Sequence, residues 1–320
     1  MVARFVHTEE VTGSNPVTPT LEDGSRNFRG PFFSLLVGRR PAVAAATPWR
    51  SDRSGSVAGY GRRVPTLREP DAADLPSLLA VAAACEQTGI QSVTDDGYRA
   101  HVQGTGRLLV SGDAGAVQAY GGLVERGGAA YLTDLFVHPD ARDRGHGRAL
   151  LAELWGNREE RMTSSSQDPR ALSGYARYGA RPRWPLLYLR LPGTFGPSAG
   201  EPVVERPFVV GDAGWYADQR GLRTVSVAGA AGVVVDQPTG VRLLRAVGPG
   251  AAELLLLADG LAAMVGPEAS VGLVVPGPNP ALPGLLERGA RIRDLDLWCA
   301  TDGAADLVDP VRELPSPSLA

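Results

Sequence analysis

The chain has 320 residues with 43% hydrophobic residues and a formal net charge of −3, which is the balance of a folded protein rather than of a basic nucleic-acid binder. Its two cysteines, Cys85 and Cys299, lack C-x-x-C spacing, and its four histidines are scattered. This pattern excludes a disulfide framework and a metal site, and it predicts a reducing, cytoplasmic environment.

Residues 1–63 are predicted to be an extension outside the folded protein. The stretch 1–20, with its motif G-S-N-P, is what the arms of a transfer RNA gene yield when translated, so we expect the true start at Val57 or Val64. The rival interpretation is a genuine disordered basic arm, because this extension holds nine Arg against five acidic residues and leaves about −7 for the remainder. The apolar run 32–37 is too short for a membrane span or a signal peptide.

From residue 64 onward, enough chain remains for two small domains. The segment 66–69 is predicted to form a strand, and 70–87 an alanine- and leucine-rich helix opened by Pro and Asp. The segments 107–111 and 116–125 then predict a hairpin around a glycine-containing turn.

The next segment carries the most information. A β-rich stretch, 130–137, ends at His138-Pro139, and the hexapeptide R-D-R-G-H-G at 142–147 leads into the helix-forming run 148–155. A glycine-containing turn at a helix N-terminus points several backbone N–H groups and the positive end of the helix dipole at one spot. Such a spot suits a phosphate, although a plain connecting turn is the alternative. Arginine at 142 excludes the G-x-G-x-x-G pattern, and the absence of lysine excludes a Walker A loop.

This hexapeptide resembles the acyl-CoA-binding loop [RQ]-x-x-G-x-[GA] of the Gcn5-related N-acetyltransferase (GNAT) family, which directly follows the fourth strand. The resemblance implies an α+β fold whose central, mostly antiparallel sheet is flanked by helices. It also implies that the acyl-CoA pyrophosphate binds the backbone amides of the hexapeptide, with pantetheine against the strand end. The residues implied in acyl-CoA binding are Leu135, Phe136, Val137, Arg142, Asp143, Arg144, Gly145, His146, Gly147, Arg148 and Asp168.

The segment 168–180 resembles a second family motif, N-x-x-A-x-x-x-Y-x-x-x-G-F, at Ala171, Tyr175 and Gly179. The resemblance implies that Tyr175 protonates the departing CoA thiolate, a role for which a phenol with a pKa of about 10 is suited. The alternative role for Tyr175 is packing on one face of an amphipathic helix. Asp168 stands where the family usually has an Asn that bonds pantetheine, and it is also a good helix cap.

The sequence specifies the general base poorly. The common family position on the fourth strand falls on Tyr131, and the nearest carboxylate is Asp134. Asp134 is therefore our candidate base, and deprotonation of the amine through ordered water is the alternative.

A weak internal repeat with an offset of 110 relates 168–190 to 278–300 and predicts a second GNAT-like unit. This unit lacks the loop, since G-P-G at 248–250 replaces it, and Leu285 stands where Tyr175 does. The predicted organisation is an extension 1–63, a catalytic domain 64–192, a linker 193–207, a degenerate domain 208–303 and a loosely packed Pro-rich tail 304–320.

These features predict an N-acyltransferase that moves an acetyl or other short acyl group from acyl-CoA to a small-molecule or peptide amine. Direct attack in a ternary complex is expected, without metal, nucleic acid or membrane, and a homodimer is left open. The alternative is a catalytically weak, acyl-CoA-binding pseudoenzyme that acts as a sensor or scaffold. The tandem arrangement also resembles the mycothiol synthase family, but there the active unit is C-terminal, so its substrate is not carried over.

Overall fold

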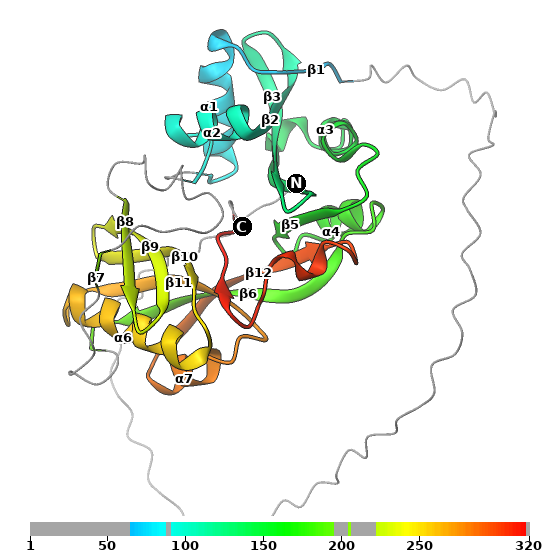
Figure 1. The fold of residues 1–320 in the computed structure, drawn as a ribbon. Coiled ribbons are helices and arrows are strands. Elements are labelled where there is room, and N and C mark those ends of the chain that lie inside the picture. Colours follow the sequence, from blue (N-terminus) through cyan, green and yellow to red (C-terminus); the bar gives the residue numbers. More distant parts are fainter. Residues whose placement is uncertain (1–64, 88–90, 195–203, 206–221, 318–320) are drawn as a thin grey trace, which may run out of the picture. The chain divides into compact units, whose positions relative to one another are not determined.

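The computed structural model describes residues 65–87, 91–194, 204–205 and 222–317, so the predictions for 1–63 lie outside the described residues. The strands of the first half are β1 (Leu67–Arg68), β2 (Gly106–Asp113), β3 (Ala116–Arg126), β4 (Ala129–Val137), β5 (Arg161–Ser165) and β6 (Arg181–Pro192). Its helices are α1 (Leu75–Ala84), α2 (Asp96–Thr105), α3 (His146–Trp155) and α4 (Pro169–Ala176) (Figure 1).

The strands of the second half are β7 (Val204–Glu205), β8 (Leu222–Val227), β9 (Ala230–Gln237), β10 (Gly240–Val247), β11 (Ser270–Pro276), β12 (Arg291–Ala300) and β13 (Glu313–Leu314). Its described helices are α6 (Ala251–Val265) and α7 (Leu282–Glu287). None of the described helices is long and apolar enough to cross a membrane.

The first half follows the predicted order of elements. The predicted helix 70–87 is shorter than expected, because Asp71 caps a 3-10 turn at Ala72–Asp74 and α1 begins only after it. Asp74 is fully buried and accepts hydrogen bonds from the amides of Asp71 and Gly115 and from Arg68. The Arg68 guanidinium holds the pKa of this carboxyl well below its usual range. Asp74 thus ties β1 and the β2–β3 turn to the start of α1.

One sheet runs through both halves in the order β1-β2-β3-β4-β5-β12-β6-β11-β10-β9-β8-β7, with β13 paired to β10. Most neighbours are antiparallel, but β4 and β5 are parallel and pair only between Ala130–Leu132 and Arg161–Thr163. Beyond these pairs the two strands separate. We call the resulting gap, between 133–137 of β4 and Ser164–Ser165 of β5, the first opening.

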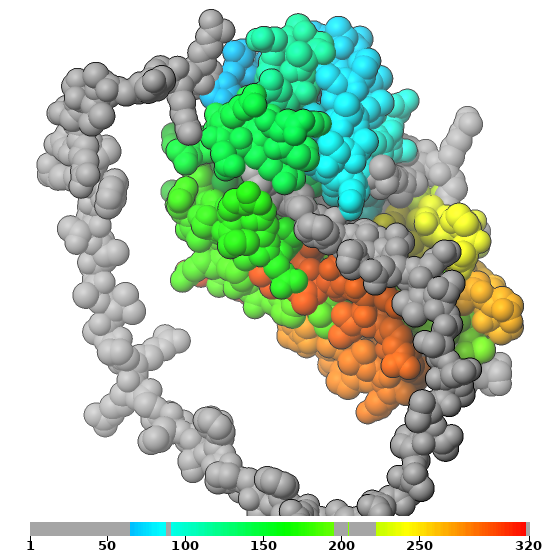
Figure 2. All heavy atoms as spheres, turned by 180° about the vertical axis from the view of Figure 1, so that it is seen from behind, coloured from blue at the N-terminus to red at the C-terminus, as the bar shows by residue number. Residues whose placement is uncertain are grey.

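The two halves exchange their last strands. β6 of the first half pairs with β11 and β12 of the second, whereas β12 inserts between β5 and β6. β6 begins at Arg181 and β12 at Arg291, which is the offset of 110 that the repeat predicted. In Figure 2 the orange-to-red residues of the second half lie directly against green residues of the first. The segments 64–192 and 208–303 are therefore joined strand by strand rather than closed as separate sheets.

The expectation of a loosely packed tail is wrong for residues 304–317. Ala304, Val308 and Leu314 are buried, and β13 pairs with β10 through Ala246–Leu314 and Val247–Glu313. The predicted linker also contributes a strand, since β7 pairs with β8. Both strands, β7 and β13, lie in Pro-containing stretches. Each has two residues, which are too few for an alternating apolar pattern to predict a strand.

Helices pack on both faces of the first-half sheet. Buried residues of α1 and α2 share one core with alternate residues of β2, β3 and β4, which defines the α1–α2 face. Buried residues of α3 and α4 share another core with the intervening strand residues, which defines the α3–α4 face. In the second half, α6 and α7 pack with β8, β10 and β11 in a third core.

Strand exchange makes a testable prediction about fragments. A fragment of residues 65–192 lacks β12, so β5 has an unpaired edge and the core loses Trp298 and Ala300. We expect no cooperative thermal transition for this fragment alone, as measured by circular dichroism. Co-expression with residues 193–320 should restore a one-to-one complex in light scattering. A monomeric 65–192 fragment that melts cooperatively would contradict the prediction.

Candidate functional site

The loop before α3 has the backbone geometry that the hexapeptide predicted. Gly145 is the N-cap of α3 with φ 95°, and Asp143 has φ 62°. This left-handed region favours glycine and tolerates Asp better than most residues. The Cβ of any residue at 145 would meet no atom within 4 Å, so the backbone conformation, rather than space, favours glycine there.

Successive amides of this loop are left unbonded. Ala149 is the first residue of α3 whose amide bonds back within the chain, to Gly145 O at 3.0 Å. The six amides from Asp143 to Arg148 have no acceptor within the described part of the protein. The Arg142 amide instead donates to Pro139 O at 3.3 Å, so the set of free amides begins one residue later than predicted. A run of amides at the N-terminus of a ten-residue helix is a preformed anion site.

A cleft of about 720 Å³ lies between this loop and α4, a volume within the usual range for small-molecule sites. Three arginines, Arg148, Arg170 and Arg177, line it and make it attractive to phosphate groups. The predicted site residues that line the cleft are Leu135, Val137, Asp143, Gly145, His146, Gly147, Arg148 and Tyr175.

The remaining predicted residues lie elsewhere. Phe136 turns to the α1–α2 face and packs against Tyr120, with ring centroids 5.3 Å apart. Arg144 lines a separate pocket beside α1, and Arg142 has a buried Nε that lacks a hydrogen-bond partner among the described residues.

Asp168 caps α4 rather than lining the cleft. Its carboxylate accepts the Arg170 amide at 2.8 Å and forms an ion pair with the Arg170 side chain at 3.2 Å. Burial alone would raise the pKa of Asp168, but the bonds from Arg170 outweigh it and leave the pKa lowered. The implied pantetheine contact of this side chain therefore has no support in its position.

The backbone edge of β4 faces the first opening. The His138 amide donates to Gln118 O of β3 at 2.9 Å, and alternate strand residues direct their amides to opposite sides. By this alternation, the amides of Leu135 and Val137 point away from β3 and toward the opening, whereas that of Phe136 points to β3. The opening thus presents an unpaired strand edge beside the free amides of the loop.

His146 is the first residue of α3 and lines the cleft. Its Nδ1 lies 2.8 Å from Ser111 Oγ, and its side chain is buried. Burial and the nearby Arg144 lower its pKa from the ordinary value. His146 is therefore a hydrogen-bonded wall of the cleft, and its lowered pKa favours the neutral imidazole.

Tyr175 combines both roles that its sequence position suggested. It is 1% exposed and packs edge-on against Trp155, with ring centroids 5.5 Å apart, yet it also lines the cleft. Burial raises its pKa above the ordinary value, with smaller contributions from the neighbouring Cys299 and Asp296. The phenol therefore stays protonated at neutral pH and is available as a proton donor.

Asp134 lies on the α1–α2 face, across the sheet from the cleft. Its Oδ2 accepts the Tyr98 hydroxyl at 2.7 Å and the Thr133 hydroxyl at 2.8 Å, and no described residue bonds to Oδ1. Burial raises the pKa of Asp134 to about 6, against the opposing effect of these two bonds. A carboxylate with a pKa in this range is suited to accept a proton near neutral pH. Nothing in the sequence pattern singled out Tyr98, which arrives from α2.

The second half repeats this architecture but fills its own gap. β10 and β11 are parallel and pair only between 240–242 and 270–272. Beyond these pairs β13 bonds to β10, and Gly248 N donates to Arg312 O at 2.9 Å. A buried ion pair of 3.0 Å between Arg245 and Glu313 fixes β13 in place. Pro249, which has no N–H, stands in the turn before α6, and Leu285 is buried on α7.

No group of three or more His, Cys, Asp or Glu side chains that could hold a metal ion occurs among the described residues. Cys85 and Cys299 are both buried free thiols. Burial raises the pKa of Cys299 to about 12 and also raises that of Cys85, so neither is a thiolate at neutral pH.

Comparison with known proteins supports this description. Residues 80–160 match the family model described as the acetyltransferase (GNAT) family. A stretch of 157 residues is 34% identical to a mycothiol acetyltransferase of Kineococcus radiotolerans and covers 44% of this chain and 52% of that relative. A second match, over 100 residues, is 38% identical to a mycothiol acetyltransferase of Streptomyces griseus subsp. griseus and covers 29% of this chain and 32% of that relative. The matches thus span about half, or less, of the length of these relatives.

Solved structures resemble the fold at low sequence identity. A protein of Pyrococcus horikoshii has a TM-score of 0.65 at 12% identity, over 84% of this chain and 100% of that one. A GCN5-related N-acetyltransferase of Sphaerobacter thermophilus has a TM-score of 0.51 at 15% identity, and the match covers 76% of this chain and 96% of that one. A tandem GNAT protein from the clavulanic acid biosynthesis pathway has a TM-score of 0.50 at 18% identity, and the match covers 74% of this chain and 98% of that one. These likenesses confirm the predicted mixed α and β fold.

The raised pKa of Asp134 makes a prediction about stability. The folded protein favours the protonated Asp134 carboxyl. This preference adds to the free energy of unfolding below about pH 4, and the addition is lost as the pH rises through about 6. Relative to Asp134→Asn, wild-type protein should lose about 2 kcal/mol of unfolding free energy between pH 4 and pH 7. Urea unfolding at four pH values measures this difference, with the exposed Asp306→Asn as control. A difference that does not vary with pH would refute the assignment.

Proposed function

We propose that this chain, which carries a GNAT acetyltransferase domain, transfers an acetyl or other short acyl group from acyl-CoA to a primary amine. The observation that carries the proposal is the run of six unbonded amides at the start of α3, beside the unpaired edge of β4. Together they offer an anion site and a strand-like hydrogen-bonding edge within one cleft. A pyrophosphate followed by an extended amide-bearing arm is the ligand that matches both.

In this proposal each part of acyl-CoA has a partner. The pyrophosphate binds the amides from Asp143 to Arg148, while Arg170 and Arg177 neutralise phosphate charge at the rim. The pantetheine arm pairs with the amides of Leu135 and Val137 as an added strand would. The thioester then lies in the first opening, where the α3–α4 face and the α1–α2 face communicate.

The proposed reaction is direct attack of the amine on the thioester carbonyl. Asp134, on the α1–α2 face, takes a proton from the attacking nitrogen, and a β4 amide polarises the carbonyl oxygen. The tetrahedral intermediate collapses as the carbon–sulfur bond breaks. Tyr175, on the cleft side, donates its proton to the leaving thiolate. The base and the acid thus act from opposite faces of the sheet, through the opening between them.

The names of the relatives support a small-molecule acceptor, since both are mycothiol acetyltransferases. Because the matches cover about half of those proteins or less, we propose the class, a small-molecule primary amine, without assigning mycothiol chemistry to this chain. A peptide amine remains the second member of the predicted acceptor class.

Calorimetric titration of acetyl-CoA tests the anion site. Gly145→Glu places a carboxylate among the free amides and should abolish binding. Gly128→Glu is a matched control, because Gly128 also has a positive φ, of 88°, has open space around its Cβ and lies in the exposed β3–β4 turn. Its binding should equal that of the wild type. Unchanged binding by Gly145→Glu, or no binding by folded wild-type protein, would sink the acyltransferase proposal.

Tyr175→Phe tests the proton donor and separates the enzyme from the pseudoenzyme interpretation. Removing one hydroxyl from the ring should lower turnover about 100-fold or more and leave acetyl-CoA affinity within about twofold. Thiol release with a primary amine and calorimetry measure the two quantities. Tyr178→Phe, which alters a hydroxyl on a neighbouring cleft residue, is the control. Unchanged turnover in Tyr175→Phe would remove Tyr175 from the mechanism.

A further inference from the structure

The segment that follows β13 crosses onto the α1–α2 face of the first half. We call residues 315–317 the strap, and all three are buried. The Tyr131 hydroxyl of β4 donates to Pro317 O at 2.7 Å. The Ser316 hydroxyl donates to Gln91 Oε1, in the segment before α2, at 3.0 Å. Because Tyr131 belongs to the core of the α1–α2 face, the strap covers part of that face.

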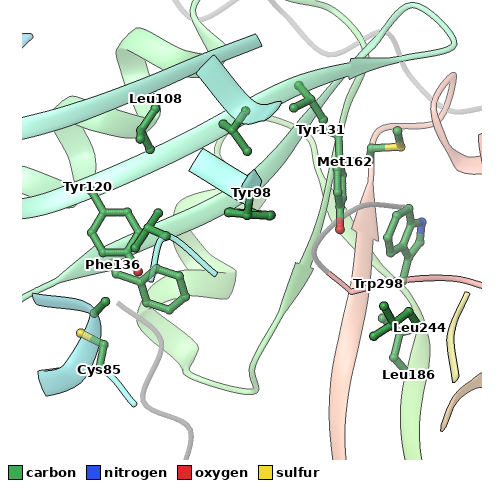
Figure 3. Close-up of a cluster of buried hydrophobic side chains, with 14 of the residues drawn as sticks. Cys85, Tyr98, Leu108, Tyr120, Tyr131, Phe136, Met162, Leu186, Leu244 and Trp298 are labelled. Carbon is green, nitrogen blue, oxygen red and sulfur yellow. The ribbon is translucent and has the colours of Figure 1, made fainter. Parts of the chain in front are cut away.

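The end of the strap lies near the proposed base. Tyr98 donates its hydroxyl to Asp134 Oδ2 at 2.7 Å. Burial chiefly raises the pKa of Tyr98, and smaller contributions come from Asp134 and from Tyr131, which lies within electrostatic reach of this pair. Figure 3 shows Tyr131 between Tyr98 and Trp298, and its ring stacks on Trp298 with centroids 5.7 Å apart. The hydroxyl that holds the strap is therefore a neighbour of the base.

This side of the site is closed while the strap is in place. Tyr98 and Tyr131 are 0% exposed, and Asp134 is 6% exposed. A general base has to lie about 3 Å from the nitrogen whose proton it takes. So small an exposed surface leaves too little room for an amine beside Asp134. A segment that covers this face therefore has to move before the proposed attack.

The strap is firmly anchored at its base and weakly along its length. At its base, β13 pairs with β10, and Arg245 forms a buried ion pair of 3.0 Å with Glu313. Beyond β13, no described residue forms a backbone–backbone hydrogen bond with 315–317. Pro315 and Pro317 have no N–H to donate. Segments with few backbone hydrogen bonds open at the lowest free energy, so the strap is the segment of this face best suited to move.

We propose that the strap is an autoinhibitory gate, which has to detach from Tyr131 and Gln91 before an amine acceptor reaches Asp134. Its hinge lies between Leu314, which stays paired in β13, and Pro315. Acyl-CoA binds in the cleft on the α3–α4 face whether the gate is open or closed, so the gate controls the acceptor alone. This inference rests on the proposed function, because it takes Asp134 as the base and the first opening as the position of the thioester.

Weakening the strap tests the gate by kinetics. Ser316→Ala and Gln91→Ala, each in the full chain, remove the hydrogen bond between the strap and the segment before α2. With n-butylamine, followed by thiol release from acetyl-CoA, each should raise kcat/KM about threefold to tenfold, because the loss of one hydrogen bond increases the open fraction by that factor. The gain should appear in the KM of the amine, while acetyl-CoA affinity stays within about twofold. Ser226→Ala removes a hydroxyl bond to Val204 O in the second half and should change neither quantity.

Thiol labelling tests the opening itself and needs no acceptor. Ser316→Cys changes little in size and places a thiol at a position that is 0% exposed. Cys85 and Cys299 are also buried, so they serve as internal references in the same chain. In folded protein, a thiol-specific aromatic disulfide should modify the introduced thiol at least about 100-fold faster than the two native thiols, because the strap opens locally. Mass spectrometry of digested samples assigns the modified positions.

The outcomes separate this inference from the proposed function. Modification of all three thiols at one rate overturns the inference alone, since the strap then opens only when the whole protein does. Unchanged or lowered use of n-butylamine by both Ser316→Ala and Gln91→Ala, with acetyl-CoA binding retained, also overturns it alone. Absence of acetyl-CoA binding by the wild type overturns the proposed function and the inference with it.

Discussion

The constraint on which the rest of the site depends is the early end of the parallel pairing between β4 and β5. After Leu132 and Thr163 the strands separate, and the amides of Leu135 and Val137 face a gap instead of a neighbouring strand. Backbone groups in such a position require a hydrogen-bonding partner, because an unsatisfied buried amide is costly. The loop before α3 lies at the same end of β4, so we propose that its free amides and this edge bind one ligand. The gap also lies between the two faces of the sheet, and the proposed mechanism uses Tyr175 from one face and Asp134 from the other.

Exchange of β6 and β12 determines what surrounds that gap. β5 would be an edge strand without β12, and edge strands with unpaired backbone are poor walls for a site. The second half therefore contributes to the first even though its own loop contains Pro249 and its helix α7 carries Leu285 in place of a tyrosine. Loss of these chemical groups is compatible with retention of the fold, because the packing of α6 and α7 on their strands needs only apolar side chains.

The sequence predicted those parts of the site whose conformation depends on residues adjacent in the chain. The hexapeptide predicted the helix start and its glycine turn, and Asp168 capped α4 as its residue type favours. Strand alternation held a further signal: Leu135 and Val137 share one face, so Phe136 had to lie on the other, with Asp134. The partner of β5 could not be predicted, because β6 and β12 have similar patterns and their register depends on contacts more than 100 residues apart. The same holds for Tyr98, whose bond to Asp134 joins α2 to β4, and for β13, whose two residues carry no periodicity.

The occupation of the second gap by β13 has a consequence for ligand-binding behaviour. Two equivalent ligand sites in one protein can show homotropic cooperativity, in which one bound molecule alters the affinity for the next. Here the residues from Arg312 to Leu314 occupy the gap that corresponds to the one proposed to bind the pantetheine arm. Among the described strands, one of the two repeated gaps is therefore filled and the other, between β4 and β5, is not. In the proposed binding mode, saturation of the gap between β4 and β5 by acyl-CoA should follow a simple hyperbola, although the fold itself is repeated.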